Sequence, residues 1–298
     1  MKVLITGASG FIGHWCLKEF QNRGIEVTGL GFRTRANFEG PKLLNIDLQD
    51  EREWIKCLKH EKADALVHLA WDIAPWNNST HTRWLHISKK LISTFFESGG
   101  SYVFTAGTSM EYEWNGMECS EDGGQFAPTT AYGRAKHELW KSCENFASAR
   151  NLEYSHGRIF FVCGPGQKRD KFLPALISSL IAGKNFYCSG SYLYRDYLDA
   201  RMYAKLIADL VTKRLVGDFN LSSGKSISIE KMAVEIASLV GESELLSFAK
   251  DPEIMPQDRY VVGNVEKLQQ AIGYTPKFNL TTTIKDTIDH IQTYPKLT

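Results

Sequence analysis

Short apolar runs alternate along the chain with segments whose apolar residues recur at helical spacing. The apolar runs fall near residues 2–6, 25–30, 43–46, 64–70, 101–106 and 153–161, and each has the length of a buried strand. Helical periodicity fills residues 11–22, 51–60, 80–98 and 131–150. Strands that alternate with helices in this way predict βαβ units, and therefore a doubly wound parallel sheet of the α/β class.

The alternation loosens after residue 163. A loop rich in Gly, Pro and Lys covers residues 164–171, and beyond it we expect a helix over 173–182, a strand over 192–198 and helices near 200–213, 229–240 and 281–292. We therefore predict a Rossmann domain over residues 1–162 and a smaller α/β lobe over residues 163–298, and we allow for chain crossings between them. The second lobe should cover the carboxyl ends of the strands, where open α/β sheets bind ligands.

The first apolar run ends in three glycines spaced three apart, directly before a helical segment. The first glycine allows a tight turn, the second lets backbone approach a pyrophosphate, and the third lets the helix pack on the strand. The helix N-terminus adds N–H groups and a positive dipole for the phosphates. We therefore predict that this turn binds a dinucleotide through Gly7, Ser9, Gly10, Phe11, Ile12 and Gly13.

A tyrosine and a lysine stand four residues apart, at Tyr132 and Lys136, and share one face of the predicted helix. A free phenol titrates near ~10, and a cation beside it favours the phenolate and moves the pKa toward neutrality. We expect an acid–base pair in which Lys136 lowers the pKa of Tyr132. This spacing is also common on solvated helix faces, and it is the glycine turn that favours the chemical interpretation.

With both motifs the chain resembles the extended short-chain dehydrogenase/reductase family, the NAD(P)-dependent epimerases, dehydratases and reductases of nucleotide sugars. The resemblance covers essentially the whole length, with later landmarks at residues 164–166, 195–199 and 273–276. It implies that Asp47 and Leu48 contact the adenine and that Leu69 and Ala70 line the cofactor. It also implies a nucleotide-diphosphate sugar as substrate and a homodimer as the assembly.

The end of the second predicted strand indicates which cofactor is used. An acid there accepts hydrogen bonds from the ribose hydroxyls of NAD, whereas a 2′-phosphate needs cations. Residues 27–35 contain no acid but include Arg33 and Arg35. Because a planar guanidinium suits phosphate, we predict NADP(H), with two solvated loop arginines as the alternative.

The resemblance also implies a catalytic hydroxyl at the end of the fifth strand, four residues before an aromatic side chain. Counting back from Tyr112 gives Thr108, with Ser109 as the alternative and as a substrate contact. In the mechanism so implied, Lys136 holds the nicotinamide ribose and Thr108 orients the substrate carbonyl. Tyr132 then protonates the carbonyl oxygen as hydride arrives.

Residues beside this core separate the reaction types. Dehydratases of the family follow the catalytic Thr with an Asp-Glu pair, where this chain has Ser109 and Met110. A dual epimerase/reductase of the family uses a Cys and a His at positions that match Met110 and Lys171. Neither residue suits that two-base mechanism, so hydride transfer alone is favoured.

Cations of the second lobe are candidates for substrate anchoring. Arg195 and Arg259 match arginines that hold the nucleotide diphosphate, although Arg195 could equally form a structural ion pair with Asp196. Lys171 belongs to a basic loop that either reaches a phosphate or stays solvated, and it is kept as a candidate substrate contact. Two positions depart from the family pattern, because Phe161 and His86 stand where the family usually has Asn. Phe161 leaves undetermined which residues contact the sugar diphosphate. His86 is expected to be a core or surface histidine.

Composition agrees with an enzyme of the cytoplasm. At 298 residues, 43% hydrophobic and formal net charge +1, the chain carries no field that would recruit nucleic acid or an anionic membrane. No apolar run approaches the ~20 residues of a membrane span, and the apolar start is too short for a signal peptide. The six cysteines are scattered without Cys-x-x-Cys, which indicates neither a zinc site nor a disulfide framework.

Three functions follow as hypotheses. The leading one is NADPH-dependent reduction of a nucleotide-linked 4-keto-6-deoxysugar, for deoxysugar biosynthesis. The second is an NDP-sugar epimerase that oxidises its substrate transiently with bound NAD. The third is a non-catalytic, NADP-sensing regulator, and the presence of Thr108, Tyr132 and Lys136 argues against it.

Overall fold

The computed structural model of the protein describes residues 1–31, 40–72, 75–123, 126–250, 252 and 257–295. Within them, seven strands form one parallel sheet in the order β11-β6-β5-β4-β1-β2-β3. The strand order reverses between β1 and β4, which makes this the switch point of a doubly wound sheet and confirms the predicted fold class. The strands are β1 (Lys2–Thr6), β2 (Glu26–Gly31), β3 (Lys42–Asn45), β4 (Ala65–His68), β5 (Tyr102–Thr108), β6 (Glu153–Ile159) and β11 (Gly217–Leu221).

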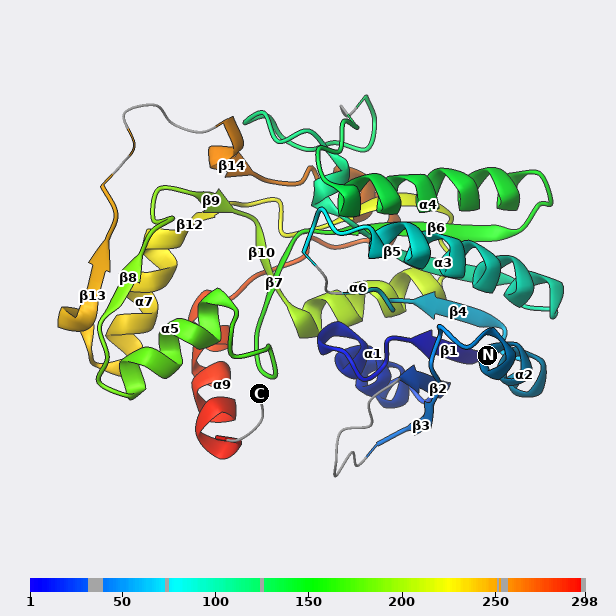
Figure 1. The fold of residues 1–298 in the computed structure, drawn as a ribbon, viewed down its shortest axis with the longest axis horizontal. Coiled ribbons are helices and arrows are strands. Elements are labelled where there is room, and N and C mark those ends of the chain that lie inside the picture. The colour runs from blue at the N-terminus through cyan, green and yellow to red at the C-terminus, as the bar shows by residue number, and fades with distance from the viewer. Residues whose placement is uncertain (32–39, 73–74, 124–125, 251, 253–256, 296–298) are drawn as a thin grey trace.

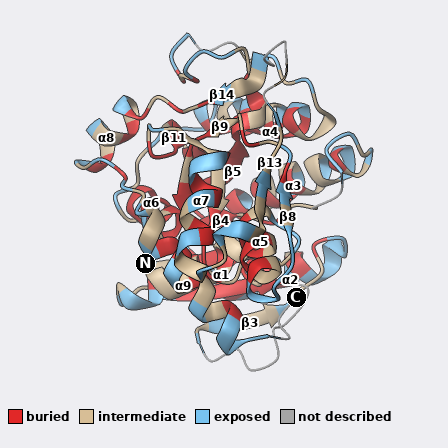
Figure 2. Ribbon diagram, turned by 90° about the vertical axis from the view of Figure 1, so that its left-hand side faces the viewer, coloured by how far each residue is buried: buried red, intermediate tan, exposed pale blue. Residues whose placement is uncertain are grey.

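Helices cover both faces of this sheet (Figure 1). Alternate residues of a strand serve the two resulting cores: Val3 and Ile5 of β1 join one core, and Leu4 joins the other. The buried residues accordingly concentrate in the central layer (Figure 2). The first core is covered by α1 (Phe11–Asn22) and α6 (Ala200–Thr212), and the second by α2 (Glu51–Glu61), α3 (Thr80–Glu97) and α4 (Ala131–Ser148).

Local capping fixes where several helices begin. The Asp50 carboxylate accepts a hydrogen bond from the backbone N–H of Arg52, at 3.0 Å, at the start of α2. The Thr130 hydroxyl accepts from the N–H of Gly133, also at 3.0 Å, at the start of α4. Helix α1 differs, because its N-cap residue is Gly10 and no side chain caps it.

The second lobe has its own core. Its three main helices are α5 (Phe172–Ile181), α7 (Ile229–Val240) and α9 (Leu280–Thr293), which share one cluster of buried apolar residues and lie beside the sheet domain (Figure 1). The shorter elements are the strand pairs β7 (Phe161–Cys163) with β10 (Tyr197–Asp199) and β8 (Phe186–Cys188) with β13 (Leu246–Phe248), and the three strands β12 (Ile227–Ser228), β9 (Tyr194–Arg195) and β14 (Tyr260–Val261). Helix α8 (Glu266–Ile272) packs on the sheet domain, since Leu268 and Ile272 join the first core.

The chain crosses between the two lobes more than once. The apolar run predicted as one strand over 153–161 breaks at Phe160, so that β6 stays in the central sheet and β7 pairs with β10 of the second lobe. Helix α6 and strand β11 follow residue 163, yet they join the sheet domain. Strand β11 was not predicted, because its sequence Gly-Asp-Phe-Asn-Leu carries little strand signal on its own.

The predicted strand over 192–198 is two short strands, β9 and β10, in different sheets. They separate at Asp196, whose buried carboxylate accepts hydrogen bonds from the backbone N–H groups of Ser223, Gly224 and Gly263. A buried acid that is satisfied in this way holds the chain at the corner between the strands.

All six cysteines are buried free thiols. Among the residues that the structure describes, no helix combines the length and the apolar composition needed to cross a bilayer.

Candidate active site

The glycine turn between β1 and α1 is as tight as its spacing predicts. Gly7 has a φ of +70°, and the N–H of Gly10 donates to its carbonyl at 2.9 Å. A Cβ at Gly13 would lie 2.2 Å from the Gly7 carbonyl oxygen, and a Cβ at Gly7 would lie 2.7 Å from the backbone nitrogen of Ala70. Since no side chain caps α1, its first N–H groups face the turn, which suits a pyrophosphate.

Buried side chains hold the neighbouring strand end against this turn. The Thr6 hydroxyl oxygen accepts from the N–H of Ala70 at 3.3 Å and lies 2.8 Å from Nδ1 of His68. The other ring nitrogen of His68 lies 2.8 Å from the Ser88 hydroxyl. Burial lowers the pKa of His68 to about 3, so this imidazole is neutral at ordinary pH. Leu69 and Ala70 are thereby fixed beside the glycines.

Other predicted cofactor contacts are distributed as follows. Asp47 and Leu48 follow β3, where the Asp47 carboxylate accepts from the N–H of Gln49 at 2.9 Å and Leu48 is buried. Ser9 lies against β2, since a Cβ at Gly31 would approach its hydroxyl oxygen to 2.6 Å. Arg33 and Arg35 lie outside the described residues.

The structure brings together the three predicted catalytic residues. Thr108 ends β5, and Tyr132 lies in the first turn of α4 and shares a hydrogen bond with the Thr108 side chain. Lys136 is buried one turn later, and its Nζ donates to the Ala106 carbonyl at 2.9 Å. Because Ser109 is also buried but only Thr108 makes this contact with Tyr132, the geometry favours Thr108 over Ser109.

The expected effect of Lys136 on Tyr132 is not found. Burial and the Glu111 carboxylate raise the pKa of Tyr132, and only the hydrogen bond with Thr108 acts to lower it. The resulting pKa is about 12. The physical reason lies in where the ammonium points: its Nζ is 3.9 Å from the centre of the Trp71 ring and 5.9 Å from that of the Tyr132 ring. Burial lowers the pKa of Lys136 itself to about 7, against the opposing effect of Glu111.

Sequence reasoning missed two aromatic neighbours of this pair. Trp71 covers the Lys136 ammonium, and its indole N–H donates to Nδ1 of His81 at 3.2 Å. His81 then donates from Nε2 to the Pro75 carbonyl at 3.1 Å, and its ring centre lies 5.3 Å from that of Tyr132. A bulky residue directly after Leu69 and Ala70 was the available signal for Trp71.

The predicted substrate contacts of the second lobe have intramolecular partners. Nη1 of Arg195 donates to the carbonyls of Tyr194, Asp258 and Arg259, and Nη2 contacts the Asp258 carboxylate at 3.1 Å. Its guanidinium carbon lies 5.4 Å from the centre of the Phe161 ring, at the first position that departs from the family pattern. Arg195 therefore forms an ion pair, but its partner is Asp258 and not the predicted Asp196, whose carboxylate accepts from backbone N–H groups instead.

Two other cations are more accessible. Arg259 is half-buried, and its guanidinium carbon lies 5.7 Å from the ring centre of Tyr194 and 5.4 Å from that of Tyr260. Lys171 caps the start of α5, is exposed and contacts the Asp170 carboxylate at 3.9 Å. Arg259 thus remains the better placed candidate for an anionic ligand.

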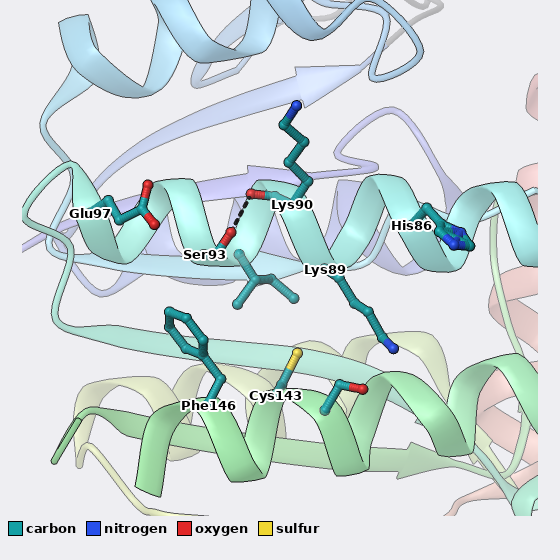
Figure 3. A pocket seen from close by; sticks show the side chains of 9 residues that line it. His86, Lys89, Lys90, Ser93, Glu97, Cys143 and Phe146 are labelled. Atoms are coloured by element: carbon teal, nitrogen blue, oxygen red, sulfur yellow. Dashed lines mark hydrogen bonds between the residues drawn. The ribbon is translucent and has the colours of Figure 1, made fainter. Parts of the chain in front are cut away.

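A cavity of about 530 Å³ lies elsewhere, between α3 and α4 (Figure 3). Ile92, Cys143 and Phe146 supply much of its apolar surface, with Lys89 and Ser93 beside them. The second departure from the family pattern, His86, lines this cavity as an exposed residue whose Nδ1 lies 3.1 Å from the Thr82 carbonyl. His86 is therefore a surface histidine, as expected.

A family model described as the NAD dependent epimerase/dehydratase family matches residues 3–222. The chain belongs to this family. It is therefore an enzyme of the extended short-chain dehydrogenase/reductase type, and it uses a nicotinamide cofactor. The uncapped α1 N-terminus and the close approach of Gly7 to Ala70 fit such a cofactor.

Similar proteins include enzymes of deoxysugar nucleotides. The chain is 26% identical over 243 residues to a dTDP-6-deoxy-L-talose 4-dehydrogenase (NAD(+)) of Aggregatibacter actinomycetemcomitans, and the match covers 79% of this chain and 88% of the relative. It is 21% identical to a dTDP-4-dehydro-6-deoxy-D-allose reductase of a Streptomyces species, over 92% and 91% of the two chains. The solved structure of MoeE5 in complex with UDP-glucuronic acid and NAD has the same fold, with a TM-score of 0.84, 23% identity and coverage of 98% and 99%.

Proposed function

We propose that the protein reduces the 4-keto group of a nucleotide-linked 4-keto-6-deoxysugar, with NADPH as the reductant. The observation that carries this proposal is the buried phenol of Tyr132, which has a pKa of about 12 and shares a hydrogen bond with Thr108. Such a phenol is protonated at neutral pH, so it is ready to give a proton to a carbonyl oxygen. Two relatives named as a 4-dehydrogenase and a 4-dehydro reductase of dTDP-linked 6-deoxysugars support the substrate class.

The residues divide the work of reduction. Thr108 orients the carbonyl, Tyr132 donates the proton to its oxygen, and the bound cofactor supplies the hydride. Lys136 would hold the nicotinamide ribose, and the turn from Gly7 to Gly13 would hold the pyrophosphate. Thr108 and Lys136 are buried and Tyr132 is half-buried, so the site limits the access of water to the reacting carbonyl.

Epimerisation is the second candidate, because the family description includes it. An epimerase that works next to a carbonyl, at C3 or C5, needs one group to remove a carbon-bound proton and another to return one on the opposite face, whereas one that oxidises its substrate transiently with bound NAD needs no such pair. Met110, which would have to serve as one member of that pair, has a thioether that takes no proton, and only its backbone N–H contacts Thr108, at 3.3 Å. The regulator hypothesis is not carried further, because the chain belongs to an enzyme family and has Thr108, Tyr132 and Lys136.

Turnover in heavy water tests the proposal against this alternative. The enzyme is given NADPH and CDP-, dTDP-, GDP- or UDP-linked 4-keto-6-deoxysugars, and the products are examined by NMR and mass spectrometry. We expect cofactor-derived hydrogen at C4 and no enzyme-dependent deuterium at C3 or C5. Deuterium at C3 or C5 above an enzyme-free control would instead promote an epimerase that abstracts a proton. NAD released by denaturing the purified protein, with no net oxidation of added NADPH, would promote the epimerase that works by transient oxidation.

We propose NADPH over NADH because Arg33 and Arg35 stand where an NAD site has an acid. Two similar proteins carry NAD in their names, so the preference needs a direct measurement. Arg33→Ala should weaken the preference for NADPH by roughly 1 to 3 kcal/mol, the scale of a lost charge-assisted contact. Equal dissociation constants for the two cofactors in the unmodified protein would contradict this assignment.

We also propose a homodimer that pairs through α3 and α4. The cavity between these helices is lined by the half-buried Phe146 and the buried Ile92 and Cys143, and Lys89 and Glu97 lie at its margins (Figure 3). An apolar surface with a charged rim is typical of a protein interface. A second copy of the chain is the occupant that this face suits, and a cytoplasmic setting is proposed with it.

A further inference from the structure

A cluster of charged side chains lies completely buried beside the catalytic residues. Glu111 belongs to the 3-10 helix η1 (Ser109–Glu111) that follows β5, and it meets two side chains of β6. Nε2 of His156 lies 3.0 Å from one Glu111 oxygen, and Nε of Arg158 lies 3.2 Å from the other. All three side chains are fully shielded from solvent, and the proposed mechanism uses none of them.

Burying charged groups destabilises a folded protein unless each of them is paired and hydrogen-bonded. Burial alone would raise the pKa of Glu111, yet His156, Arg158 and the Thr108 N–H together lower it to about 2. Nη1 of Arg158 also binds the Asp218 carboxylate at 2.6 Å. Glu111 is therefore a carboxylate at every pH at which the enzyme would work.

Glu111 contacts the catalytic turn directly. Its Oε1 accepts from the backbone N–H of Thr108 at 2.8 Å, and the Thr108 hydroxyl accepts from the N–H of Met110, so the two residues cap η1 reciprocally. The preceding Gly107 has no space for a side chain, because a Cβ there would lie 2.2 Å from Nε2 of His156 and 2.5 Å from Oε1 of Glu111. The carboxylate thus fixes the backbone that presents Thr108 to Tyr132.

A hydrogen-bonded chain holds the imidazole in place. His156 donates from Nε2 to Glu111, so its Nδ1 accepts from the Thr105 hydroxyl at 2.8 Å. Thr105 in turn accepts from the Tyr154 hydroxyl at 2.7 Å. Hydrogen bonds from residues of β5 and β6, and not solvent, therefore hold the Glu111 carboxylate in place.

The same charge acts on the catalytic pair. Lys136 and Glu111 contact the same turn, because Nζ of Lys136 donates to the Ala106 carbonyl at 2.9 Å and Glu111 accepts from the Thr108 N–H at 2.8 Å. Burial lowers the pKa of Lys136, whereas Glu111 raises it and also raises that of Tyr132. Titratable and charged groups that face this cluster are Tyr132, Lys136 and His137 from α4, His156 and Arg158 from β6, His68 from β4, Tyr112 after η1 and Asp218 from β11.

We propose that Glu111 is a positioning residue: its carboxylate fixes the turn that carries Thr108, and its buried negative charge keeps Lys136 in the ammonium form that binds the cofactor ribose. The first role rests on the proposed function. The second role depends only on the nicotinamide cofactor, so it can be tested without any sugar substrate.

The test is the pH dependence of NADPH binding by Glu111→Gln. Glutamine keeps the oxygen that accepts from Thr108 and removes the charge. Binding is followed by quenching of protein fluorescence between about pH 5 and 10, in a Tyr132→Phe background, so that Lys136 and not the phenol titrates in this range. We expect affinity to fall as Lys136 loses its proton, and the midpoint of that fall to move to lower pH by about one unit in Glu111→Gln.

Glu61→Gln is the matched control. Glu61 is also a buried carboxylate, with Lys2 and Lys42 as partners. It lies near the start of β1, at the amino ends of the strands, whereas Glu111 lies at their carboxyl ends. Glu61→Gln should lower the midpoint temperature of thermal unfolding without moving the pH midpoint of NADPH binding. If Glu111→Gln does not fold, the double variant Glu111→Gln/Arg158→Met removes the stranded guanidinium and should show the same shift.

A binding midpoint that is absent in the unmodified protein, or unchanged by Glu111→Gln, overturns the proposal. Failure of the proposed function is distinguished separately: NADPH would bind with the expected pH dependence, while no 4-keto sugar would be turned over. With an active substrate, Glu111→Ala should lower kcat more than KM changes, because it also removes the oxygen that holds the turn with Thr108, and Glu111→Gln should lower kcat less.

Discussion

The proposed role of Tyr132 as proton donor depends on its phenol oxygen alone. Tyr132→Phe keeps the ring that lies against His81 and Trp71 and removes only the proton donor. We expect NADPH to bind nearly normally and kcat at pH 7 to fall by ~100-fold or more, the usual loss of a general acid. Single-turnover kinetics and a parallel binding titration measure the two effects. Retention of more than about a tenth of kcat would mean that another group donates the proton.

Lys136 is a buried ammonium whose charged form is unfavourable in the folded protein. Its pKa is lowered from 10.5 to about 7, so between these values the unfolded chain binds more protons than the folded chain. The free energy of unfolding contributed by this residue therefore rises with pH through that window.

Replacing this lysine should therefore stabilise the protein. We expect Lys136→Met to raise the free energy of unfolding by roughly 1 to 3 kcal/mol at pH 7, and by less near pH 10, while turnover is lost. Urea denaturation at several pH values measures the difference. Lys56→Met, at an exposed position of α2, should change it by less than about 0.5 kcal/mol. A destabilised Lys136→Met protein would contradict this account of burial.

At the scale of elements, the junction of β1 with α1 combines stability and binding. Gly13→Ala places a Cβ 2.2 Å from the Gly7 carbonyl oxygen and 2.8 Å from the Ala8 Cα, so the helix must move away from the turn. We expect the free energy of unfolding to fall by roughly 1 to 3 kcal/mol, as in overpacked cores, and NADPH affinity to fall with it. Thermal unfolding with and without NADPH measures both.

Gly190→Ala is the control for that substitution. A Cβ there meets only the end of the Leu193 side chain, at 3.3 Å, and no strained backbone is involved. Both quantities should stay near those of the unmodified protein. Equal cofactor affinity in Gly13→Ala and the unmodified protein would show that the turn tolerates displacement.

At the scale of the whole molecule, the proposed homodimer depends on the outer face of α3 and α4. The chain mass is 33.7 kDa, and the proposed homodimer should be seen at about twice that value by light scattering after size exclusion. Ser93→Arg places a long cation in the middle of the cavity in Figure 3 and should give the monomer mass. Lys56→Arg on α2 is the control and should leave the mass unchanged. A monomeric unmodified protein would exclude the dimer.

The sequence by itself determined the sheet domain closely. Local signals were strong there: glycines spaced three apart, apolar runs of strand length, and polar caps such as Asp50 and Thr130. These features depend on residues near in sequence, so periodicity reports them directly. The placement of Tyr132 and Lys136 on one helix face was predictable for the same reason, whereas Thr108 was predicted from the family resemblance by counting back from Tyr112.

Only the tertiary structure decided how distant segments meet. Strand β11 joins the sheet domain because it pairs with β6, although its own sequence carries little strand signal. The pKa of Tyr132 follows from burial and from Glu111, and the ammonium of Lys136 points to Trp71 rather than to the phenol. Desolvation and charge depend on everything packed around a group, and residue spacing along a helix does not report that environment.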